Sequence, residues 1–443
     1  MMRSASWRPS SAPKSRMPSA ARTRREFLGL GLAAAATPFL PGRSVAQVAP
    51  KVVVVGGGFA GATCARFLHR DDPRIEVTLV EPNPVFTACP FSNAVLAGIR
   101  EIREQRFDYQ AVRADGVRLV QAAATAIDPQ TRQVRLGDGT MLPYDRLVVA
   151  PGIDFRWGVI PGYTEAVTGR MPHAWKAGEQ TLLLKRQLDE MPDGGLVVIA
   201  VPANPYRCPP GPYERASLIA HSLRTQKPRS KVLLLDAKDN FSKQGLFTAA
   251  WRQLYPGLLE WVSLSQGGKV THVDPSAGTV STDFEEYKPA VANVIPPQQA
   301  GRIAELAGVA DRTGWCPVDP VSFESRLQPH VHVVGDAAIA GAMPKSAFAA
   351  NAQAKICAAA IVALLRGTTP ADPVLVNTCY SLVAPDYGIS IAGVYRPRQG
   401  QLADVEGAGG TSPLMAPPGT RSLEAQYARA WFKTITGEVF GQG

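Results

Sequence analysis

Three glycines, Gly56, Gly58 and Gly61, have the spacing of a dinucleotide-binding turn and directly follow the apolar run 52–55. Such a turn points backbone N–H groups at a pyrophosphate, and the N-terminus of the following helix favours negative charge. Glu81 ends the next apolar run, where a carboxylate can accept a hydrogen bond from a ribose hydroxyl. These four residues predict a binding site for one dinucleotide.

A later apolar run, residues 196–200, leads into a segment that cannot form the same turn. Residues 201–212 are rich in proline and contain Cys208. Proline has no N–H to offer a phosphate and cannot adopt the conformation of the glycine turn. Asp236 ends the run 231–236 in the position of a ribose-binding acid, but without the glycine turn we interpret it as a strand-end cap. We expect no nucleotide in this second unit, where a cysteine takes the place of the nicotinamide cofactor.

The six cysteines of the chain allow many pairings, so the sequence alone does not choose among them. Cys64 and Cys357 fall within predicted helices and are expected to be core residues, because a free cysteine behaves as a small apolar side chain. Cys316 follows a tryptophan in a predicted turn and is also expected to be structural. Cys208 and Cys379 are each predicted to lie in a loop rich in residues that end regular structure. From position alone, they could form a disulfide between domains or be two unrelated thiols.

The six histidines show no ligand spacing and lie near no cluster of cysteines or acids, so we assign no metal site. The chain also lacks the Cys-x-x-Cys-His motif that attaches a c-type haem. If a haem accepts electrons from this protein, the haem must belong to another polypeptide.

Apolar runs and helical segments alternate along the chain, which predicts an α/β fold with parallel sheets covered by helices on both faces. The expected strands are 51–55, 76–80, 143–152, 196–200, 231–236 and 331–334, and the expected helices are 61–69, 175–191 and 346–365. We expect a first dinucleotide-binding domain that is interrupted by a second domain and then resumed. The expected units are a signal peptide at 1–46, the first domain at 47–185 and 292–366, the second domain at 186–291 and a C-terminal domain at 367–443.

Residues 1–46 have the pattern of an export signal. Arg24 and Arg25 form a twin-arginine motif, an apolar stretch covers residues 27–40, and residues 44–46 form a small-x-small cleavage site. The apolar stretch is shorter than the ~20 residues that span a bilayer, so a permanent anchor is less favoured than a removable signal. This pattern predicts export by the twin-arginine route to the periplasm, where disulfides persist. Without these residues the net charge falls from +10 to +3, so no nucleic-acid surface is expected.

Three elements in the expected order resemble the flavoproteins that contain two dinucleotide-binding (Rossmann-like) domains of the disulfide-reductase type. They are the glycine turn, the segment 147–152 and the segment 334–337. In that superfamily a C-terminal interface domain completes the fold. The resemblance implies that Gly335 and Asp336 lie against the ribityl and pyrophosphate part of a bound flavin.

Four longer segments resemble the flavoprotein subunit of flavocytochrome c sulfide dehydrogenases. These segments are 86–93, 207–215, 314–319 and 377–381. The resemblance implies that the chain binds FAD and oxidises sulfide to sulfur or polysulfide. It also implies a heterodimer with a c-type cytochrome subunit, which carries the haem and receives the electrons one at a time.

The same resemblance assigns roles to three cysteines. Cys208 and Cys379 would form a redox-active disulfide, on which hydrosulfide attacks one sulfur to give a persulfide and release the other as a thiolate. Cys89 would bond through its sulfur to the 8-methyl carbon of FAD; an unattached thiol in the flavin pocket is the alternative. Pro90, directly after Cys89, restricts the backbone conformation of that cysteine.

Three further residues are candidates for the site. Glu214, six residues after Cys208, could take a proton from sulfide, or it could be a helix N-terminal carboxylate stabilised by the helix dipole. Lys345 could neutralise the reduced flavin, or it could be a solvated lysine. Trp431 matches a tryptophan that the family places near the flavin, or it packs a C-terminal helix against the rest of the molecule.

Three other functions remain open from the sequence. A sulfide:quinone oxidoreductase has the same fold but docks to membranes, and the residues at the C-terminus give a weak signal for that. A non-catalytic flavoprotein that delivers electrons would use its cysteines only for structure. A pyridine-nucleotide reductase is disfavoured by the proline-rich second unit.

Overall fold

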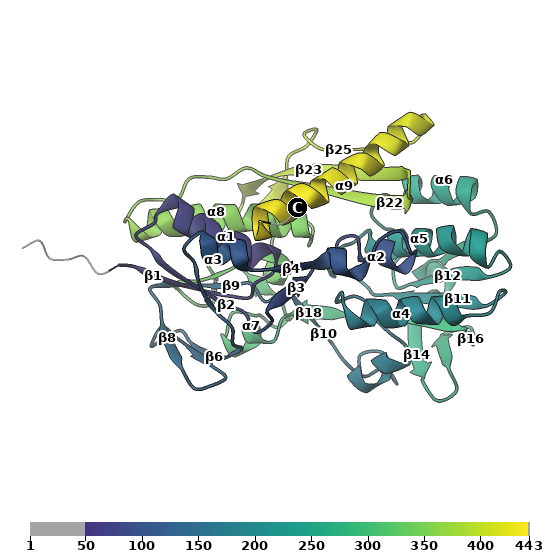
Figure 1. Cartoon of the computed structure of the whole chain (residues 1–443), viewed down its shortest axis with the longest axis horizontal. Helices are drawn as coiled ribbons and strands as arrows, with labels where there is room; N and C mark the ends of the chain where they lie inside the picture. The colour runs from purple at the N-terminus through teal and green to yellow at the C-terminus, as the bar shows by residue number, and fades with distance from the viewer. Residues whose placement is uncertain (1–48, 442–443) are drawn as a thin grey trace, which may run out of the picture. The chain divides into compact units, whose positions relative to one another are not determined.

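The computed structural model describes residues 49–441 of the chain, and Figure 1 shows how their helices and strands are arranged. The predicted signal peptide, residues 1–46, lies outside the described residues. Within them, two parallel sheets are connected by helices, which confirms the predicted α/β class.

The first sheet contains five parallel strands in the order β20-β9-β1-β2-β5. Their bounds are β1 (Lys51–Val55), β2 (Glu76–Val80), β5 (Arg118–Val120), β9 (Arg146–Val149) and β20 (Val331–Val333). The valines of β1 are buried between β2 and β9, as expected for a parallel strand covered on both faces. Helix α1 (Phe59–Asp71) packs along α8 (Ala347–Leu365), and both are close to the predicted helices.

The second sheet contains four parallel strands in the order β13-β12-β11-β17. Its elements are β11 (Leu196–Val201), β12 (Lys231–Asp236), β13 (Leu259–Val262) and β17 (Val291–Val294), with α4 (Glu179–Glu190), α5 (Gly211–Gln226) and α6 (Gln244–Leu254). Strand β17 crosses the domain boundary expected at residue 292 and pairs with this second sheet. Helix α4 begins later than the expected residue 175, because Gly178 at its N-terminus has a φ of +126° that is not helical.

The C-terminal part forms an antiparallel sheet covered by the last helix. It consists of β22 (Leu375–Ala384), β23 (Tyr387–Arg398), β24 (Gln401–Asp404), β25 (Gly410–Thr411) and α9 (Pro418–Phe440). Cys379 lies within β22, opposite Ile391, so the prediction that it lies in a loop is wrong. The polar residues around it hide the strand in the local sequence, whereas pairing with β23 along its whole length stabilises the strand.

Shorter elements connect these units or cover their edges. The short strands are β3 (Val85–Thr87), β4 (Arg106–Asp108), β6 (Ala124–Asp128), β7 (Gln133–Leu136), β8 (Met141–Pro143), β10 (Ile153–Phe155), β14 (Val270–Asp274), β15 (Thr279–Thr282), β16 (Glu286–Tyr287), β18 (Gln298–Ala300), β19 (Cys316–Pro317) and β21 (Ala338–Ile339). The short helices are α2 (Ser92–Leu96), α3 (Gln110–Ala114), α7 (Ile303–Leu306) and the 3₁₀ turns η1 (Ile102–Gln105), η2 (Glu165–Gly169), η3 (Leu264–Gln266) and η4 (Gly335–Ala337).

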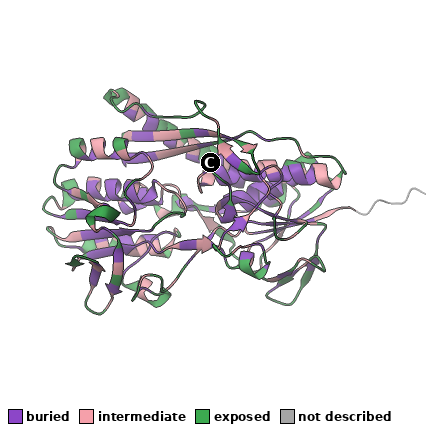
Figure 2. Cartoon of the chain, turned by 180° about the vertical axis from the view of Figure 1, so that it is seen from behind, coloured by how far each residue is buried: buried purple, intermediate pink, exposed green. Residues whose placement is uncertain are grey.

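The largest core contains residues of both parallel sheets and of the helices that pack on them, and buried residues run through both sheets in Figure 2. Within the described residues, α8 is the one helix with the length and apolar composition needed to cross a membrane. It packs against α1 and β22, and more than half of its apolar window is buried. We therefore interpret α8 as a core helix.

Candidate active site

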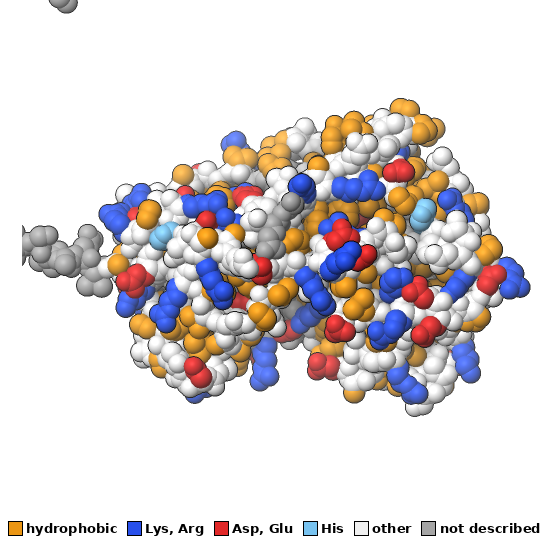
Figure 3. Space-filling model, in the orientation of Figure 1, with side chains coloured by type: hydrophobic (Ala, Val, Ile, Leu, Met, Phe, Trp, Pro, Cys, Tyr) orange, Lys and Arg blue, Asp and Glu red, His pale blue; other side chains and the backbone are white. Residues whose placement is uncertain are grey.

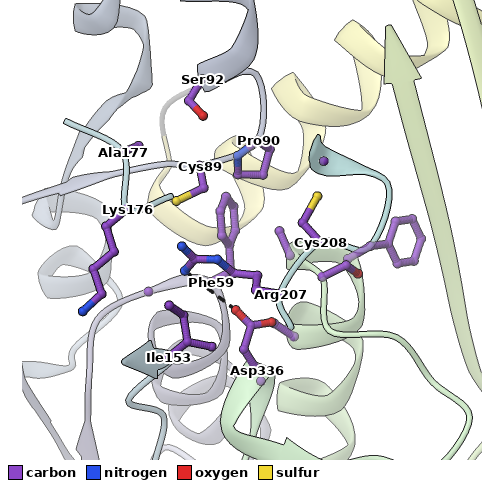
Figure 4. A pocket seen from close by; sticks show the side chains of 18 of the residues that line it. Phe59, Cys89, Pro90, Ser92, Ile153, Lys176, Ala177, Arg207, Cys208 and Asp336 are labelled. Atoms are coloured by element: carbon purple, nitrogen blue, oxygen red, sulfur yellow. Dashed lines mark ion pairs between the residues drawn. The ribbon is translucent and has the colours of Figure 1, made fainter. Parts of the chain in front are cut away.

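One cavity of about 570 Å³ brings together most of the predicted site residues from all three parts of the molecule. Its lining includes ten of them: Gly56, Gly58, Glu81, Cys89, Cys208, Glu214, Gly335, Asp336, Cys379 and Trp431. Two predicted residues, Gly61 and Lys345, lie behind this lining. Figure 4 shows the part of the cavity where Cys89, Arg207, Cys208 and Asp336 converge.

The glycine turn has no room for side chains at two of its positions. Gly56 has a φ of +101°, and a Cβ at Gly56 would lie 2.4 Å from the carbonyl oxygen of Ala150. A Cβ at Gly61 would lie 1.8 Å from the carbonyl oxygen of Gly56. Gly61 therefore keeps the start of α1 close to β1 and supports the turn from behind, although it does not line the cavity.

The acidic residue of this turn lies where the sequence analysis expected it. The Glu81 carboxylate accepts hydrogen bonds from the backbone N–H of Gly57 at 2.8 Å and from that of Asn83 at 2.9 Å. It also lines the cavity beside the turn. A ribose hydroxyl in the cavity could therefore reach a carboxylate that the backbone already holds in place.

Asp336 offers a buried acceptor that has no partner among the described residues. Its Oδ1 atom is buried and unbonded, while the Arg207 guanidinium lies 4.0 Å from Oδ2. Burial raises the pKa of the Asp336 carboxyl, and the charges of Arg207 and Lys345 oppose this shift. A buried polar atom without a partner is costly. Together with the glycine turn and Glu81, it fits the hydroxyl groups and phosphates of a bound dinucleotide.

Lys345 is partly buried and is not among the residues that line the cavity. Its ammonium donates to the carbonyl oxygens of Asp336 at 2.7 Å and Ala338 at 2.9 Å, and it lies 3.9 Å from the centre of the Trp315 ring. Burial lowers its pKa to about 8. The lysine holds the backbone of the Gly-Asp turn, so its direct contact with a flavin stays a prediction.

Cys89 follows β3 and lines the cavity opposite Asp336, with Arg207 between them (Figure 4). Its thiol donates weakly to the carbonyl oxygen of Trp175 at 3.7 Å. The Arg207 guanidinium donates to the same carbonyl. The residue is half-buried and reachable from the cavity, which a covalent bond to a cofactor would require.

Cys208 lies in the proline-rich loop between β11 and α5, with a φ of +58° that is unusual for a residue with a side chain. Its N–H donates to the carbonyl of Lys345, and its own carbonyl accepts from Gly211, both at 2.8 Å. Burial raises the pKa of its thiol, and the nearby Glu214 and Cys379 raise it further. The loop therefore holds this sulfur in a fixed position at the cavity wall.

Cys379 reaches the same cavity from β22, and Asn377 donates to its Sγ atom at 3.3 Å. All six cysteines are free thiols in the structure, so no S–S bond joins Cys208 and Cys379. The redox-active pairing of these two residues stays a prediction. The other three, Cys64, Cys316 and Cys357, are fully buried, in agreement with their expected structural role.

Glu214 lies in the first turn of α5 with both carboxylate oxygens bonded. Oε1 accepts from the N–H of Leu382 at 2.8 Å, and Oε2 accepts from the Asn93 side chain at 3.0 Å. Burial raises the pKa of this carboxyl, and the neighbouring Lys243 and Arg215 limit the rise. Both expectations, a proton carrier near the sulfurs and a carboxylate at a helix N-terminus, are compatible with this position.

Trp431 lines the cavity from α9, as expected for either of its two roles. Its ring stacks on Phe348 with 6.2 Å between ring centres, and Tyr380 lies at the same distance. The aromatic group closes one side of the cavity and packs α9 against α8 and β22.

The sequence analysis missed a buried cation beside the site. Arg215 bonds to the side chains of Asn93 and Asn293 and to the carbonyls of His173 and Ala174. Burial lowers the pKa of its guanidinium to about 10. Its place in the segment 207–215 was a signal for function, but its four partners come from distant parts of the chain.

Side chains fill the place where a nucleotide would contact the second sheet. Asp236 is fully buried, and its carboxylate accepts from Tyr213 at 2.5 Å, Lys238 at 2.5 Å and Trp261 at 2.9 Å. Phe241 stacks on Tyr213 with 3.6 Å between ring centres. Asp236 has no free oxygen for a ribose, so it is more than a strand-end cap: it anchors a polar network.

A metal site is not evident within the described residues, where no group of three or more His, Cys, Asp or Glu side chains could hold an ion.

Models of three protein families match the chain. Residues 181–296 match the central part of the sulfide dehydrogenase (flavocytochrome c) flavoprotein chain, and residues 371–440 match the flavin-binding part of flavocytochrome c sulphide dehydrogenase. Residues 50–189 match the pyridine nucleotide-disulphide oxidoreductases.

Two solved structures share the fold of this chain. The sulfide:quinone oxidoreductase from Aquifex aeolicus has a TM-score of 0.68 at 18% identity, with 89% of this chain and 92% of the other covered. Putidaredoxin reductase, in its covalent complex with putidaredoxin, has a TM-score of 0.62 at 19% identity, with 89% and 99% covered. These likenesses confirm the predicted fold of two Rossmann-like domains.

Two relatives are similar in sequence. The mitochondrial sulfide:quinone oxidoreductase of Mus musculus is 23% identical over 299 residues, and the match covers 65% of each chain. The sulfide dehydrogenase (flavocytochrome c) flavoprotein chain of Chlorobaculum thiosulfatiphilum is 64% identical over 45 residues, which are 10% of this chain and 94% of that sequence. The chain thus belongs to the family of flavocytochrome c sulfide dehydrogenase flavoprotein chains.

Proposed function

We propose that this protein is an FAD-dependent oxidoreductase that oxidises sulfide through Cys208 and Cys379 and passes electrons singly to a c-type cytochrome subunit. One observation carries the proposal: two cysteines from distant parts of the chain line the same cavity as a dinucleotide-binding turn. The family of the chain supports sulfide as the substrate and a flavin as the cofactor.

The residues of the cavity fit FAD at three places. The glycine turn at residues 56–61 and the N-terminus of α1 would bind the pyrophosphate, and Glu81 would bind a ribose hydroxyl. Asp336 would accept a hydrogen bond from the ribityl chain, and Cys89 would attach the ring covalently. When bound, FAD supplies an acceptor for two electrons that can be reoxidised one electron at a time.

The sulfur chemistry starts from the disulfide form of Cys208 and Cys379. Hydrosulfide attacks one of the two sulfurs, a new S–S bond forms, and the electron pair of the broken bond stays on the other cysteine as a thiolate. A second hydrosulfide attacks the outer sulfur of the persulfide, releases the second cysteine as a thiolate and leaves as hydrogen disulfide, HSSH. Two electrons from sulfide are then stored on the cysteine pair.

Proton movement is assigned to Glu214. Its buried carboxyl has a raised pKa and lies beside Cys208, whose own pKa it raises. Such a carboxyl can carry a proton between incoming sulfide and a released sulfur. Its two hydrogen bonds hold the carboxyl in place while its protonation state changes.

Anaerobic titration of the purified holoprotein with sulfide tests the proposal. Sulfide should bleach the flavin absorbance of the native protein, and Cys208→Ser and Cys379→Ser should each abolish bleaching while the flavin remains bound. Bleaching that survives in both variants would contradict the role of the pair. A native protein that sulfide does not bleach would instead support a non-catalytic flavoprotein, and bleaching by NADH would support a pyridine-nucleotide reductase.

Mass spectrometry of the denatured holoprotein tests the two covalent bonds. We expect FAD on the peptide that contains Cys89 and a disulfide between the peptides of Cys208 and Cys379. Flavin that is released on denaturation would overturn the attachment, and free thiols at both positions in the oxidised protein would overturn the disulfide.

Export to the periplasm by the twin-arginine route is part of the proposal and rests on Arg24 and Arg25. Replacing both with lysine should retain the protein in the cytoplasm with its signal peptide uncleaved. Normal export of this variant, measured by cell fractionation, would contradict the route.

A sulfide:quinone oxidoreductase is the second candidate, and one observation favours it. Leu423 and Tyr427 on α9 and Met415 just before it are exposed, and hydrophobic side chains gather along the outer edge of this helix in Figure 3. Such an edge could contact a membrane where quinone is dissolved. Sulfide-dependent reduction of a soluble quinone, with no reduction of cytochrome c, would favour this candidate.

A further inference from the structure

Cys379 lies in a row of polar side chains on one face of β22. Residues 377, 379 and 381 alternate along the strand, so Asn377, Cys379 and Ser381 point to the same side. The Asn377 amide donates to Cys379 Sγ at 3.3 Å. Ser346 donates to the Asn377 carbonyl oxygen at 2.6 Å, which fixes the amide so that its NH₂ group points at the sulfur.

Lys243 binds β22 directly at Cys379 and Ser381. Its ammonium donates to the Cys379 carbonyl at 2.9 Å and to the Ser381 hydroxyl at 2.8 Å, so it lies on the face that carries the thiol. Lys243 is buried at the N-terminus of α6 and has a φ of +63°, which is unfavourable for a residue with a side chain. The fold keeps a buried cation and a strained backbone at this position.

The charged groups around Lys243 are mostly those of the cysteine site. Burial lowers the pKa of Lys243 to about 8, while Cys379, Glu214, Cys208 and Glu424 each raise it. Cys379 is the first of these, so a negative charge on its sulfur holds the lysine in its charged form. In the disulfide form neither sulfur carries a charge, so the sulfurs no longer raise the pKa of Lys243.

Cys208 has the opposite surroundings. Burial raises the pKa of its thiol, and Glu214 is the strongest of the charges that raise it further. Lys243 and Arg207 act against this shift but do not cancel it. The two sulfurs therefore have different surroundings. Glu214 is the strongest charge that raises the pKa of Cys208, whereas Asn377 donates to the Cys379 sulfur and Lys243 binds the Cys379 carbonyl.

We propose that Lys243 and Asn377 hold the negative charge of the reduced cysteine pair on Cys379, while Cys208 keeps the proton. Reduction of the disulfide by one hydrosulfide ion and one H₂S molecule breaks the S–S bond, releases HSSH and leaves one thiolate and one thiol, the thiol proton coming from H₂S. The thiolate is the reactive form of a cysteine, so Cys379 is the sulfur of the reduced pair that reacts. This inference rests on the proposed function in that Cys208 and Cys379 are taken as a redox pair; Lys243 and Asn377 act as positioning residues.

Residue-resolved alkylation of the reduced holoprotein tests the assignment. The protein is reduced with a phosphine under anaerobic conditions and exposed to iodoacetamide across a range of pH, and mass spectrometry follows Cys379 and Cys208 separately. In the native protein Cys379 should react faster than Cys208 at pH 7. Lys243→Met should slow the alkylation of Cys379 at that pH by about tenfold, because the thiolate loses a nearby opposite charge that stabilises it.

Three further variants distinguish the effect of the Lys243 charge from an effect on the folded structure. Lys243→Gln can still donate to the carbonyl of Cys379 but carries no charge, so it should slow Cys379 as Lys243→Met does, even if the methionine variant does not fold. Lys243→Arg should restore the native profile, and Asn377→Ala should give a smaller slowing, about threefold, because it removes a neutral donor. Lys227→Met is the control, since the Lys227 ammonium also binds two backbone carbonyls, but those of Leu188 and Asp189 rather than that of Cys379.

Two results would overturn the proposal. One is a Cys379 profile in Lys243→Gln that coincides with the native profile, and the other is faster labelling of Cys208 than of Cys379 in the native protein. Failure of the proposed function is seen in a different measurement, the bleaching of the flavin by sulfide. A shifted alkylation profile without sulfide bleaching would keep the charge assignment and overturn the function.

Discussion

The two parallel sheets of this protein end in loops with opposite chemistry. After β1, the glycine turn lines the cavity, and Glu81 lies beside it at the cavity wall. After β11, prolines and Cys208 replace the glycines, and Asp236 is fully buried by three side-chain donors. The same strand-end position thus carries a glycine turn in one half and a cysteine in the other. In the second half, side chains fill the place of a nucleotide, while β11 still positions Cys208.

The strongest test of this difference is a substitution in the turn of the first sheet. Gly61→Ala should remove most of the bound flavin, because the new Cβ would lie 1.8 Å from the Gly56 carbonyl and force the turn apart. Flavin absorbance per protein measures the loss, with circular dichroism to confirm folding. Gly169→Ala is the control, since a Cβ there meets nothing within 4 Å. Full flavin content in Gly61→Ala would show that the turn does not need the close approach.

Removing the acid of the second sheet should affect stability and leave flavin binding intact. Asp236→Ala leaves Lys238 buried without its partner, and breaking a buried pair in this way costs about 3–5 kcal/mol. Urea unfolding followed by tryptophan fluorescence measures the change. A variant as stable as the native protein would mean that the buried network does not hold this half together.

Replacing the acid of the first sheet should affect flavin binding and leave stability nearly unchanged. Glu81→Gln should weaken FAD binding about tenfold, because a charged acceptor for the ribose hydroxyl becomes neutral, and should change stability little. The measurement is the dissociation constant of FAD from flavin fluorescence, made in a Cys89→Ser background so that binding is reversible. If Glu81→Gln destabilises the protein as much as Asp236→Ala does, the contrast between the two acids is wrong.

The smallest expected effect is on the pKa of Cys208, the cysteine that follows β11 of the second sheet. Glu214 raises the pKa of Cys208, so Glu214→Gln should lower that pKa and increase the thiolate fraction at any pH below it. Alkylation of Cys208 at pH 8 should then be several-fold faster than in the native reduced protein. Unchanged or slower alkylation would contradict the sign of this interaction.

Local sequence predicted the main elements of both sheets and the first site. The valine run of β1, the glycine turn and Glu81 lie within 31 consecutive residues, 51–81, and their conformations depend on neighbours in the chain. The same holds for the proline-rich loop after β11. Local sequence did not predict the strand that contains Cys379, because β22 is stabilised by pairing with β23 rather than by its own residues.

The amino-acid sequence is sufficient to predict a dinucleotide site in the first unit, to show that the second unit lacks the glycine turn, and to identify the cysteines in unusual segments. Only the packing of distant segments brings Cys379 to the cavity of Cys208, places Asn377 at its sulfur and Lys243 at its carbonyl, and encloses Asp236. These contacts join residues that are far apart along the chain and depend on how helices and strands pack. The local sequence therefore does not predict which buried charges lie close together.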